Sequence, residues 1–224
     1  MNKRLKIFVR KFFDVIYPFD ITCAVCGEEI LTKSGCGLCP QCSEDISLTT
    51  EYKRDYGELP VYSYAYYEGT VRNIVIAEKD NDKPYLVRTV AYFLDKVIKI
   101  NKINFDYIAY VPTSKSNISK RGYDAIKFLA TELSFITGVP ILKGLKRIKN
   151  SMDQTQVEKE DRKTNISGCF EYRGEPLYGK TVLLVDDVVT TGATLNECAE
   201  ALKAGLPSRI IGLTLCRVKH SRNK

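Results

Sequence analysis

Apolar residues along the chain form short continuous runs that alternate with longer stretches of helical periodicity. The short runs predict strands at residues 61–67, 107–111, 139–142, 181–185 and 209–216. Apolar positions three and four residues apart predict helices at residues 71–79, 85–100, 123–137 and 194–204. Strands that alternate with helices indicate parallel βαβ units, which bind ligands at the carboxyl ends of the strands. We therefore predict an α/β fold in which helices flank a parallel sheet.

Two further segments depart from this alternation. Residues 5–16 carry apolar side chains at helical spacing opposite a basic face, which predicts an amphipathic helix. Such a helix either docks on the main domain or lies on a membrane surface, and we favour docking because buried amphipathic helices are much the commoner kind. Residues 149–167 are polar, lack apolar periodicity and lie between two predicted core strands, so we expect a loop over a site there.

Length and composition indicate a soluble globular protein. The 224 residues suffice for one well-packed α/β domain and a small appendage, and 44% of them are apolar and 27% charged. Charged residues interrupt the most apolar stretch near the start, so we expect no transmembrane segment and a cytoplasmic location. The formal net charge of +7 favours a partner that carries phosphates, whether a nucleotide, a nucleic acid or an anionic lipid.

Five of the eight cysteines lie within residues 23–42 and predict a metal site. Cys23-x-x-Cys26 followed by Cys39-x-x-Cys42 has the spacing of a structural zinc site with four thiolates. We favour zinc over a redox pair for two reasons. The cytosol disfavours disulfides, and a module this small has too little apolar core to fold without a cross-link such as a bound metal. Cys36 leaves an alternative open, because Cys36-x-x-Cys39 is also a pair and its use would leave Cys42 outside the site.

The polar stretch at residues 43–59 separates this module from the rest of the chain. We expect residues 1–50 to hold the N-terminal helix and the zinc knuckle, and residues 60–220 to form the main domain. The remaining cysteines are expected to be small buried apolar residues: Cys169, Cys198 and Cys216.

Residues 182–194, VLLVDDVVTTGAT, carry the most specific chemical signal. An apolar strand delivers Asp186 and Asp187 directly into a loop that opens a helix. Gly192 and Ala193 let backbone N–H groups approach an anion, and the start of the helix adds a favourable dipole. The other loop positions supply hydroxyl donors: Thr190, Thr191 and Thr194.

The two adjacent acids point to a sugar phosphate as the ligand. Carboxylates at the end of a strand can accept hydrogen bonds from vicinal ribose hydroxyls, or hold Mg²⁺ that also binds a pyrophosphate group. The plain alternative is a strand, a turn and a capped helix whose acids only favour the helix dipole, but it leaves the cost of buried paired acids unexplained. We therefore predict a site for phosphoribosyl pyrophosphate or a related ribose 5-phosphate ligand.

Two rival motifs fail on their context. Residues 174–181, GEPLYGKT, match the P-loop pattern, but a P-loop opens a helix, whereas Lys180 and Thr181 lead straight into a predicted strand. The only histidine, His220, lies in a basic tail, so no Ser-His or Cys-His catalytic arrangement is available.

The order of these motifs resembles the ComF family. VLLVDDVVTTGAT resembles the phosphoribosyl pyrophosphate motif of type I phosphoribosyltransferases. It is preceded, in the family's order, by the motifs CAVCG, LCPQC, YYEG, VPTSKSNISKRGYD and QTQVEKEDRKTNISGCF. ComF proteins are bacterial competence proteins implicated in bringing transforming DNA into the cytoplasm. The resemblance implies a type I phosphoribosyltransferase-like sheet with a small N-terminal zinc-knuckle module.

The resemblance also assigns roles by position. Asp186 and Asp187 match the family's ribose-binding acids, and residues 190–194 match its 5-phosphate loop. The loop after Pro112 matches the pyrophosphate-side loop, with Ser114 and Lys115. Further matches are the RG dipeptide, Arg121 and Gly122, and a polar stretch with Gln154, Arg162 and Asn165. Two departures fall near the second substrate: Asp124-Ala125 after Tyr123, where the family has Asn-Gln, and Glu78-Lys79-Asp80, where it has a basic and an aromatic residue.

Three functions fit these features. The leading hypothesis is a ComF-type protein that binds phosphoribosyl pyrophosphate with Mg²⁺ and acts with DNA-uptake proteins in competence. The second is an active phosphoribosyltransferase, with Asp186 and Asp187 in its catalytic set and Lys115 and Arg121 stabilising the leaving charge. The third is a module for single-stranded DNA, with stacking from Tyr64, Tyr66 and Tyr67, although we favour strand packing for these tyrosines.

Overall fold

A computed structural model describes residues 21–31, 35–46, 48–49, 52–79, 86–148 and 168–219. The predicted helix at residues 5–16, the predicted loop at residues 149–167 and His220 lie outside these ranges. In the ranges that are described, no helix combines the length and the apolar character needed to cross a membrane.

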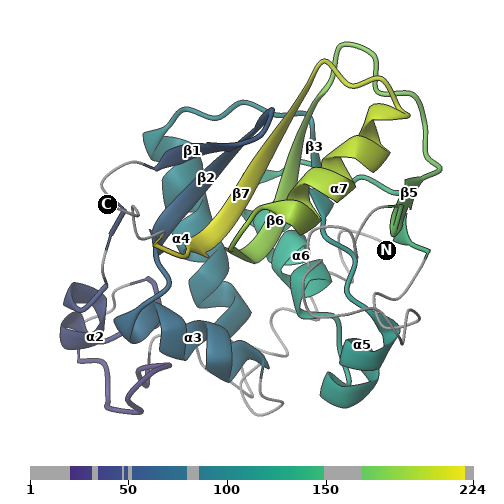
Figure 1. Ribbon diagram of the computed structural model, residues 1–224. Coiled ribbons are helices and arrows are strands. Elements are labelled where there is room, and N and C mark those ends of the chain that lie inside the picture. Colours follow the sequence, from purple (N-terminus) through teal and green to yellow (C-terminus); the bar gives the residue numbers. More distant parts are fainter. Residues whose placement is uncertain are drawn as a thin grey trace, which may run out of the picture.

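The described elements follow the predicted alternation of strands and helices (Figure 1). The strands are β1 (Lys53–Tyr56), β2 (Leu59–Tyr66), β3 (Tyr107–Tyr110), β4 (Leu145–Arg147), β5 (Phe170–Tyr172), β6 (Thr181–Val189) and β7 (Arg209–Arg217). The helices are α2 (Pro40–Glu44), α3 (Gly69–Lys79), α4 (Leu86–Ile100), α5 (Lys115–Arg121), α6 (Ala125–Thr137) and α7 (Ala193–Lys203).

A five-stranded sheet in the order β1-β2-β7-β6-β3 forms the centre of the fold. Strands β2, β7, β6 and β3 are parallel, and only β1 at the edge is antiparallel to its neighbour. Residues 182–185 of β6 are fully buried because both faces of the sheet are covered, which explains why this strand is a continuous apolar run. The carboxyl ends of β6 and β7 meet at the lower edge in Figure 1.

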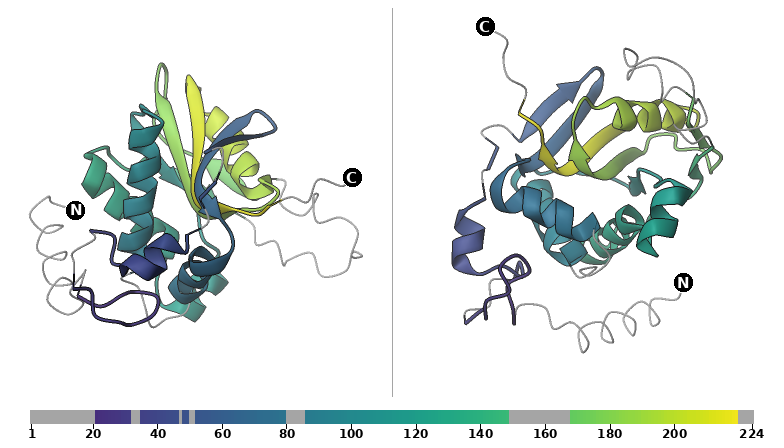
Figure 2. Two further views of the ribbon diagram at one scale, coloured as in Figure 1. Left: turned by 90° about the vertical axis from the view of Figure 1, so that its left-hand side faces the viewer. Right: turned by 60° about the horizontal axis from the view of Figure 1, so that its bottom comes forward.

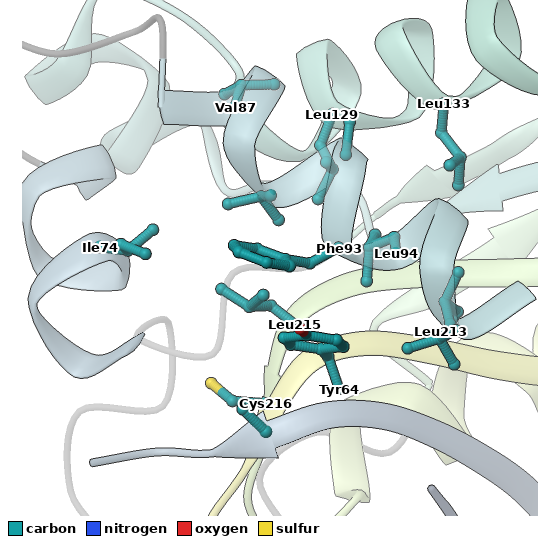
Figure 3. Packing of buried hydrophobic residues seen from close by; sticks show 14 of the residues in the cluster. Tyr64, Ile74, Val87, Phe93, Leu94, Leu129, Leu133, Leu213, Leu215 and Cys216 are labelled. Atoms are coloured by element: carbon teal, nitrogen blue, oxygen red, sulfur yellow. The ribbon is translucent and has the colours of Figure 1, made fainter. Parts of the chain in front are cut away.

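Helices cover both faces of the sheet (Figure 2). On one face, α4 and α6 pack through apolar residues spaced three and four apart, and Phe93 of α4 stacks on Tyr64 of β2 with ring centroids 4.6 Å apart (Figure 3). On the other face, α7 packs on β6 through Leu195, Cys198 and Leu202. Tyr64 is therefore a core residue, as the strand-packing interpretation predicted.

The cysteine-rich segment packs on the first of these faces. Ile30, Cys36 and Leu38 belong to the same apolar cluster as the buried residues of α3 and α4. The Asp45 carboxylate accepts hydrogen bonds from the Thr70 backbone N–H at 3.2 Å and the Thr70 hydroxyl at 2.7 Å, at the start of α3. Apolar burial and a charge-assisted cap thus join the segment to the sheet domain.

The structure corrects the prediction of a strand at residues 139–142. Only one parallel bridge forms there, between Ile108 and Ile141. Pro140 has no N–H to donate, so the ladder stops after the bonds from Ile108 N to Pro140 O and from Leu142 N to Ile108 O.

The stretch after Pro112, expected to be a loop, contains the helix α5. Its ends carry ordinary cap signals: the Ser114 hydroxyl accepts a hydrogen bond from Asn117 N, and Gly122 adopts a left-handed φ of 74°.

If the cysteine-rich segment shares one core with the sheet, a cavity in it should destabilise the whole chain. Leu38 is 0% exposed, so Leu38→Ala should lower the free energy of unfolding by about 2 to 5 kcal/mol in a single cooperative transition. Denaturant unfolding followed by tyrosine fluorescence measures this change. Leu31→Ala, at a side chain that is 91% exposed, is the control and should have almost no effect. Two separate transitions, with only one of them shifted, would contradict the shared core.

Candidate functional site

Four cysteines form a cluster with the geometry of a metal site. The Sγ atoms of Cys23, Cys26, Cys39 and Cys42 all lie within 4.8 Å of one another, and those of Cys26 and Cys39 are 3.7 Å apart. Four sulfurs at the usual zinc–sulfur distance of about 2.3 Å would be separated by about 3.8 Å. Cys36 is buried but does not join the cluster. The structure therefore brings together the four predicted ligands and leaves out the alternative.

Backbone N–H groups at the two tight turns support a thiolate in this cluster. Burial alone would raise the pKa of the Cys23 thiol, but hydrogen bonds from the backbone of Cys26, Cys39 and Val25 outweigh it and lower the pKa to about 6. Burial, together with the neighbouring sulfurs, raises the pKa of Cys42 far above its usual value. Since metals bind the thiolate, the cluster can hold a metal ion, and four sulfurs leave no open position for catalysis.

The predicted acids lie near the carboxyl end of β6, in different surroundings. The strand continues to Val189 instead of ending at residue 185 as predicted, so both acids are strand residues. Asp186 is half-buried and raises the pKa of the Cys198 thiol in α7, in addition to the larger effect of burial on that thiol. Asp187 is 8% exposed, and its carboxylate accepts a hydrogen bond from Val188 N at 2.7 Å. The Asp186 carboxylate likewise accepts one from Asp187 N at 2.9 Å. These local bonds hold both carboxylates at the end of the strand.

The loop after β6 leaves the start of α7 open to an anion. Thr190 and Thr191 are exposed. Gly192 is the N-cap residue and has a left-handed φ of 78°. Because glycine has no side chain, this position does not cap the helix. The first N–H groups of α7, beginning at Ala193 and Thr194, lack backbone partners within the helix and carry its positive dipole end. The Ala193 N–H donates a long hydrogen bond to the Thr191 hydroxyl at 3.4 Å. This arrangement suits a phosphate.

The predicted pyrophosphate-side residues follow the next strand of the sheet. Because β3 pairs with β6 in parallel, Ser114 and Lys115 emerge at the same edge as the two acids. Arg121 stands at the opposite end of α5 from Lys115. Asp124 is one of the departures from the family pattern. Its carboxylate accepts a hydrogen bond from the Thr113 hydroxyl at 2.8 Å and so links the residues before and after α5. Gln154, Arg162 and Asn165 lie outside the described residues.

The rejected P-loop match is explained by the fold. Thr181 begins β6, and Lys180 forms an ion pair with Asp106 at 3.2 Å, at the end of the strand opposite the acids. The sequence match is therefore accidental.

Two residues beside the loop at residues 190–194 were not predicted from the sequence. Tyr56 is buried, and a Cβ built on Gly192 would lie 2.5 Å from its Cδ1 atom. Arg217 is the last residue of β7 and is also buried. A charged residue closing an apolar strand was an available signal for Arg217, whereas nothing local marks Tyr56.

Comparisons with known proteins match parts of this chain. Residues 118–224 match the family model described as phosphoribosyl transferase domain. The chain is 36% identical over 88 residues to competence protein F of Haemophilus influenzae, covering 38% of each protein. It is 32% identical over 120 residues to orotate phosphoribosyltransferase of Caenorhabditis elegans, covering 54% of this chain and 41% of that protein. It is 29% identical over 109 residues to competence protein ComFC of Bacillus subtilis, covering 48% and 42%.

These matches confirm the resemblance to ComF-type competence proteins, and with the sheet topology they confirm the predicted fold class. The chain spans about two fifths of the length of each of these curated relatives.

The contact between Tyr56 and Gly192 predicts the effect of a methyl group at the loop. Gly192→Ala combines the cost of a left-handed conformation, about 1 to 2 kcal/mol, with a clash against the Tyr56 ring. Gly138→Ala is the matched control, because Gly138 has a φ of 75° but a Cβ added there would meet no atom within 4 Å. Chemical denaturation should show a clearly larger loss of stability for Gly192→Ala. Equal losses would mean that Tyr56 does not pack on the loop.

Proposed function

We propose that this chain, a homologue of competence proteins F and ComFC with a phosphoribosyl transferase domain, binds phosphoribosyl pyrophosphate and acts in the uptake of transforming DNA. One observation carries the ligand assignment: Asp186 and Asp187 lie near the carboxyl end of β6, and a short loop leads from that end to the start of α7, which the side chain of its N-cap residue does not close. Paired acids beside a phosphate cradle match a ribose 5-phosphate better than a plain anion, because the acids need a partner that donates hydrogen bonds or carries a metal. The relatives named as competence proteins support the role in transformation.

The geometry suggests how each part of the ligand would be held. The loop at residues 190–194 would bind the 5-phosphate through backbone N–H groups and threonine hydroxyls. Asp186 and Asp187 would accept hydrogen bonds from the ribose hydroxyls, and Ser114 and Lys115 would face the pyrophosphate. Mg²⁺, when bound with the ligand, would neutralise part of the pyrophosphate charge.

The cysteine cluster is proposed to hold structural zinc. Its sulfur spacing fits tetrahedral coordination, and four thiolates close the site to substrate. A cluster of four thiols suits a reducing compartment such as the cytoplasm, where cysteines stay available to bind a metal.

An active phosphoribosyltransferase is the second candidate, and the similarity to orotate phosphoribosyltransferase favours it. In this reaction a nitrogen nucleophile would attack the anomeric carbon of the ribose while the bond to pyrophosphate breaks. Lys115 and Arg121 would stabilise the negative charge on the departing pyrophosphate. Turnover with candidate bases, measured as pyrophosphate release, distinguishes this candidate from a binding protein.

A module for single-stranded DNA is the third candidate. Tyr66 is only half-buried, and its ring lies 5.5 Å from the Arg217 guanidinium carbon and 4.6 Å from the Lys219 ammonium nitrogen. A ring flanked by two cations suits stacking near a phosphate backbone. The double variant of Asp186 and Asp187 described next also tests this candidate, through its binding of single-stranded DNA.

Replacing both Asp186 and Asp187 with Asn should weaken binding of phosphoribosyl pyrophosphate about a hundredfold, because charge-assisted acceptors become neutral. Calorimetric titration with and without Mg²⁺ measures this loss and shows whether the acids act through the metal. Asp106→Asn is the control, since Asp106 bonds to Thr181 N at the other end of β6. Single-stranded DNA binding, if present, should persist in the double variant. Wild-type affinity for phosphoribosyl pyrophosphate in the double variant would refute the site.

Zinc should copurify at about one equivalent per chain, because four thiolates bind a single ion. Cys42→Ala should lose the metal and unfold the cysteine-rich segment. Cys36→Ala, at a buried cysteine outside the cluster, should keep the metal. Elemental analysis measures the metal and circular dichroism measures the folding. If Cys36→Ala lost the metal and Cys42→Ala kept it, Cys36 would be a ligand in place of Cys42.

A further inference from the structure

The last residue of β7 is a buried cation whose hydrogen-bonding groups are not satisfied. Arg217 is 5% exposed, and its Nε and Nη1 atoms have no hydrogen-bond partner in the described part of the chain. Its guanidinium lies over the face of the Tyr66 ring, at 5.5 Å from the centroid. A ring face satisfies the charge only in part, and burying a guanidinium without an anion is costly. Such a group points to an anionic ligand.

The strand register places Arg217 beside the phosphate loop. Arg217 is paired with Val189, the residue before Thr190, and Val218 N donates to Val189 O at 3.1 Å. Thr190 and Thr191 are exposed, so an anion can reach the loop from solvent, and Arg217 ends the strand that pairs with the residue before this loop.

Tyr56 brings a further unsatisfied donor to the same place. Its hydroxyl is buried and has no hydrogen-bond partner among the residues that the structure describes, and its ring packs against Gly192 at the start of α7. Burial raises the pKa of the Tyr56 hydroxyl, and the positive charges of Arg54 and Arg217 partly oppose this rise, as expected for a nearby guanidinium. Tyr56 and Arg217 thus border the loop from two strands that are far apart in the sequence.

We infer that Arg217 and Tyr56 form the inner wall of the 5-phosphate subsite and donate hydrogen bonds to the phosphate oxygens. The inference rests on the proposed binding of a ribose 5-phosphate ligand and extends it to residues of β7 and β1. Two donors from Arg217 and one from Tyr56 match the several acceptor oxygens of a phosphate group.

The sheet order distinguishes the 5-phosphate from the pyrophosphate of the ligand. Ser114 and Lys115 follow β3, which lies on one side of β6, whereas Arg217 ends β7 on the other side. Arg217 therefore lies on the side of the acids away from the pyrophosphate-side residues, and its loss should affect only ligands with the ribose 5-phosphate group.

Calorimetric titration with ribose 5-phosphate and with pyrophosphate tests this assignment. Arg217→Gln should weaken ribose 5-phosphate about tenfold to a hundredfold, Tyr56→Phe should weaken it about fivefold, and pyrophosphate binding should stay unchanged in both. Arg209→Gln, at an exposed arginine at the other end of β7, is the control and should bind like the wild type. Wild-type binding of ribose 5-phosphate by Arg217→Gln overturns the inference.

A stability measurement separates this role from a structural one. Because Arg217→Met removes a buried cation without an anionic partner, its unfolding temperature without ligand should equal or exceed that of the wild type. Adding ribose 5-phosphate should raise the unfolding temperature of the wild type and leave that of Arg217→Met nearly unchanged. A lower unfolding temperature of the ligand-free variant would make Arg217 a structural residue and overturn the inference. If the wild type itself binds no phosphoribosyl pyrophosphate, the proposed function fails, whereas wild-type binding that survives Arg217→Gln sinks only the inference.

Discussion

The parallel pairing of β6 between β7 and β3 is the constraint on which the rest of the structure depends. It buries the strand on both faces and brings three carboxyl ends to one edge of the sheet. The two acids, the start of α7 and the start of α5 all follow from those ends. Parallel strands need long crossover connections, so residues that are distant in the chain meet at this edge.

The cysteine-rich segment contributes to this arrangement from outside the sheet. Its apolar residues lie in the same cluster as those of α3 and α4, and Asp45 caps α3. A metal in the cluster would hold the two turns that position Leu38 and its neighbours. The binding energy of that metal would then stabilise the helices that cover one face of the sheet, which is more than a detached finger would achieve.

Local patterns predicted the elements whose burial is continuous or periodic, such as β6, α4 and α7, and they predicted the four clustered cysteines. They missed β1, because only Tyr56 of its four residues is buried, and they missed β4 and β5, which have three residues each. They also predicted a strand at residues 139–142, where Pro140 interrupts the ladder and only a single bridge forms. The meeting of Tyr56, Gly192 and Arg217 depends on the order of strands in the sheet, and no spacing within a single segment encodes that order.

The contact between Tyr56 and Gly192 has a consequence for how such chains diverge. A side chain at position 192 has no room while a large ring occupies position 56, and a smaller residue at position 56 would leave a gap over the loop. The two positions, separated by more than half of the chain, are therefore free to change only together. Sequence change in the hairpin of β1 and β2 is therefore coupled to change in the loop before α7. Transfer of either segment into a related protein would require transfer of the other.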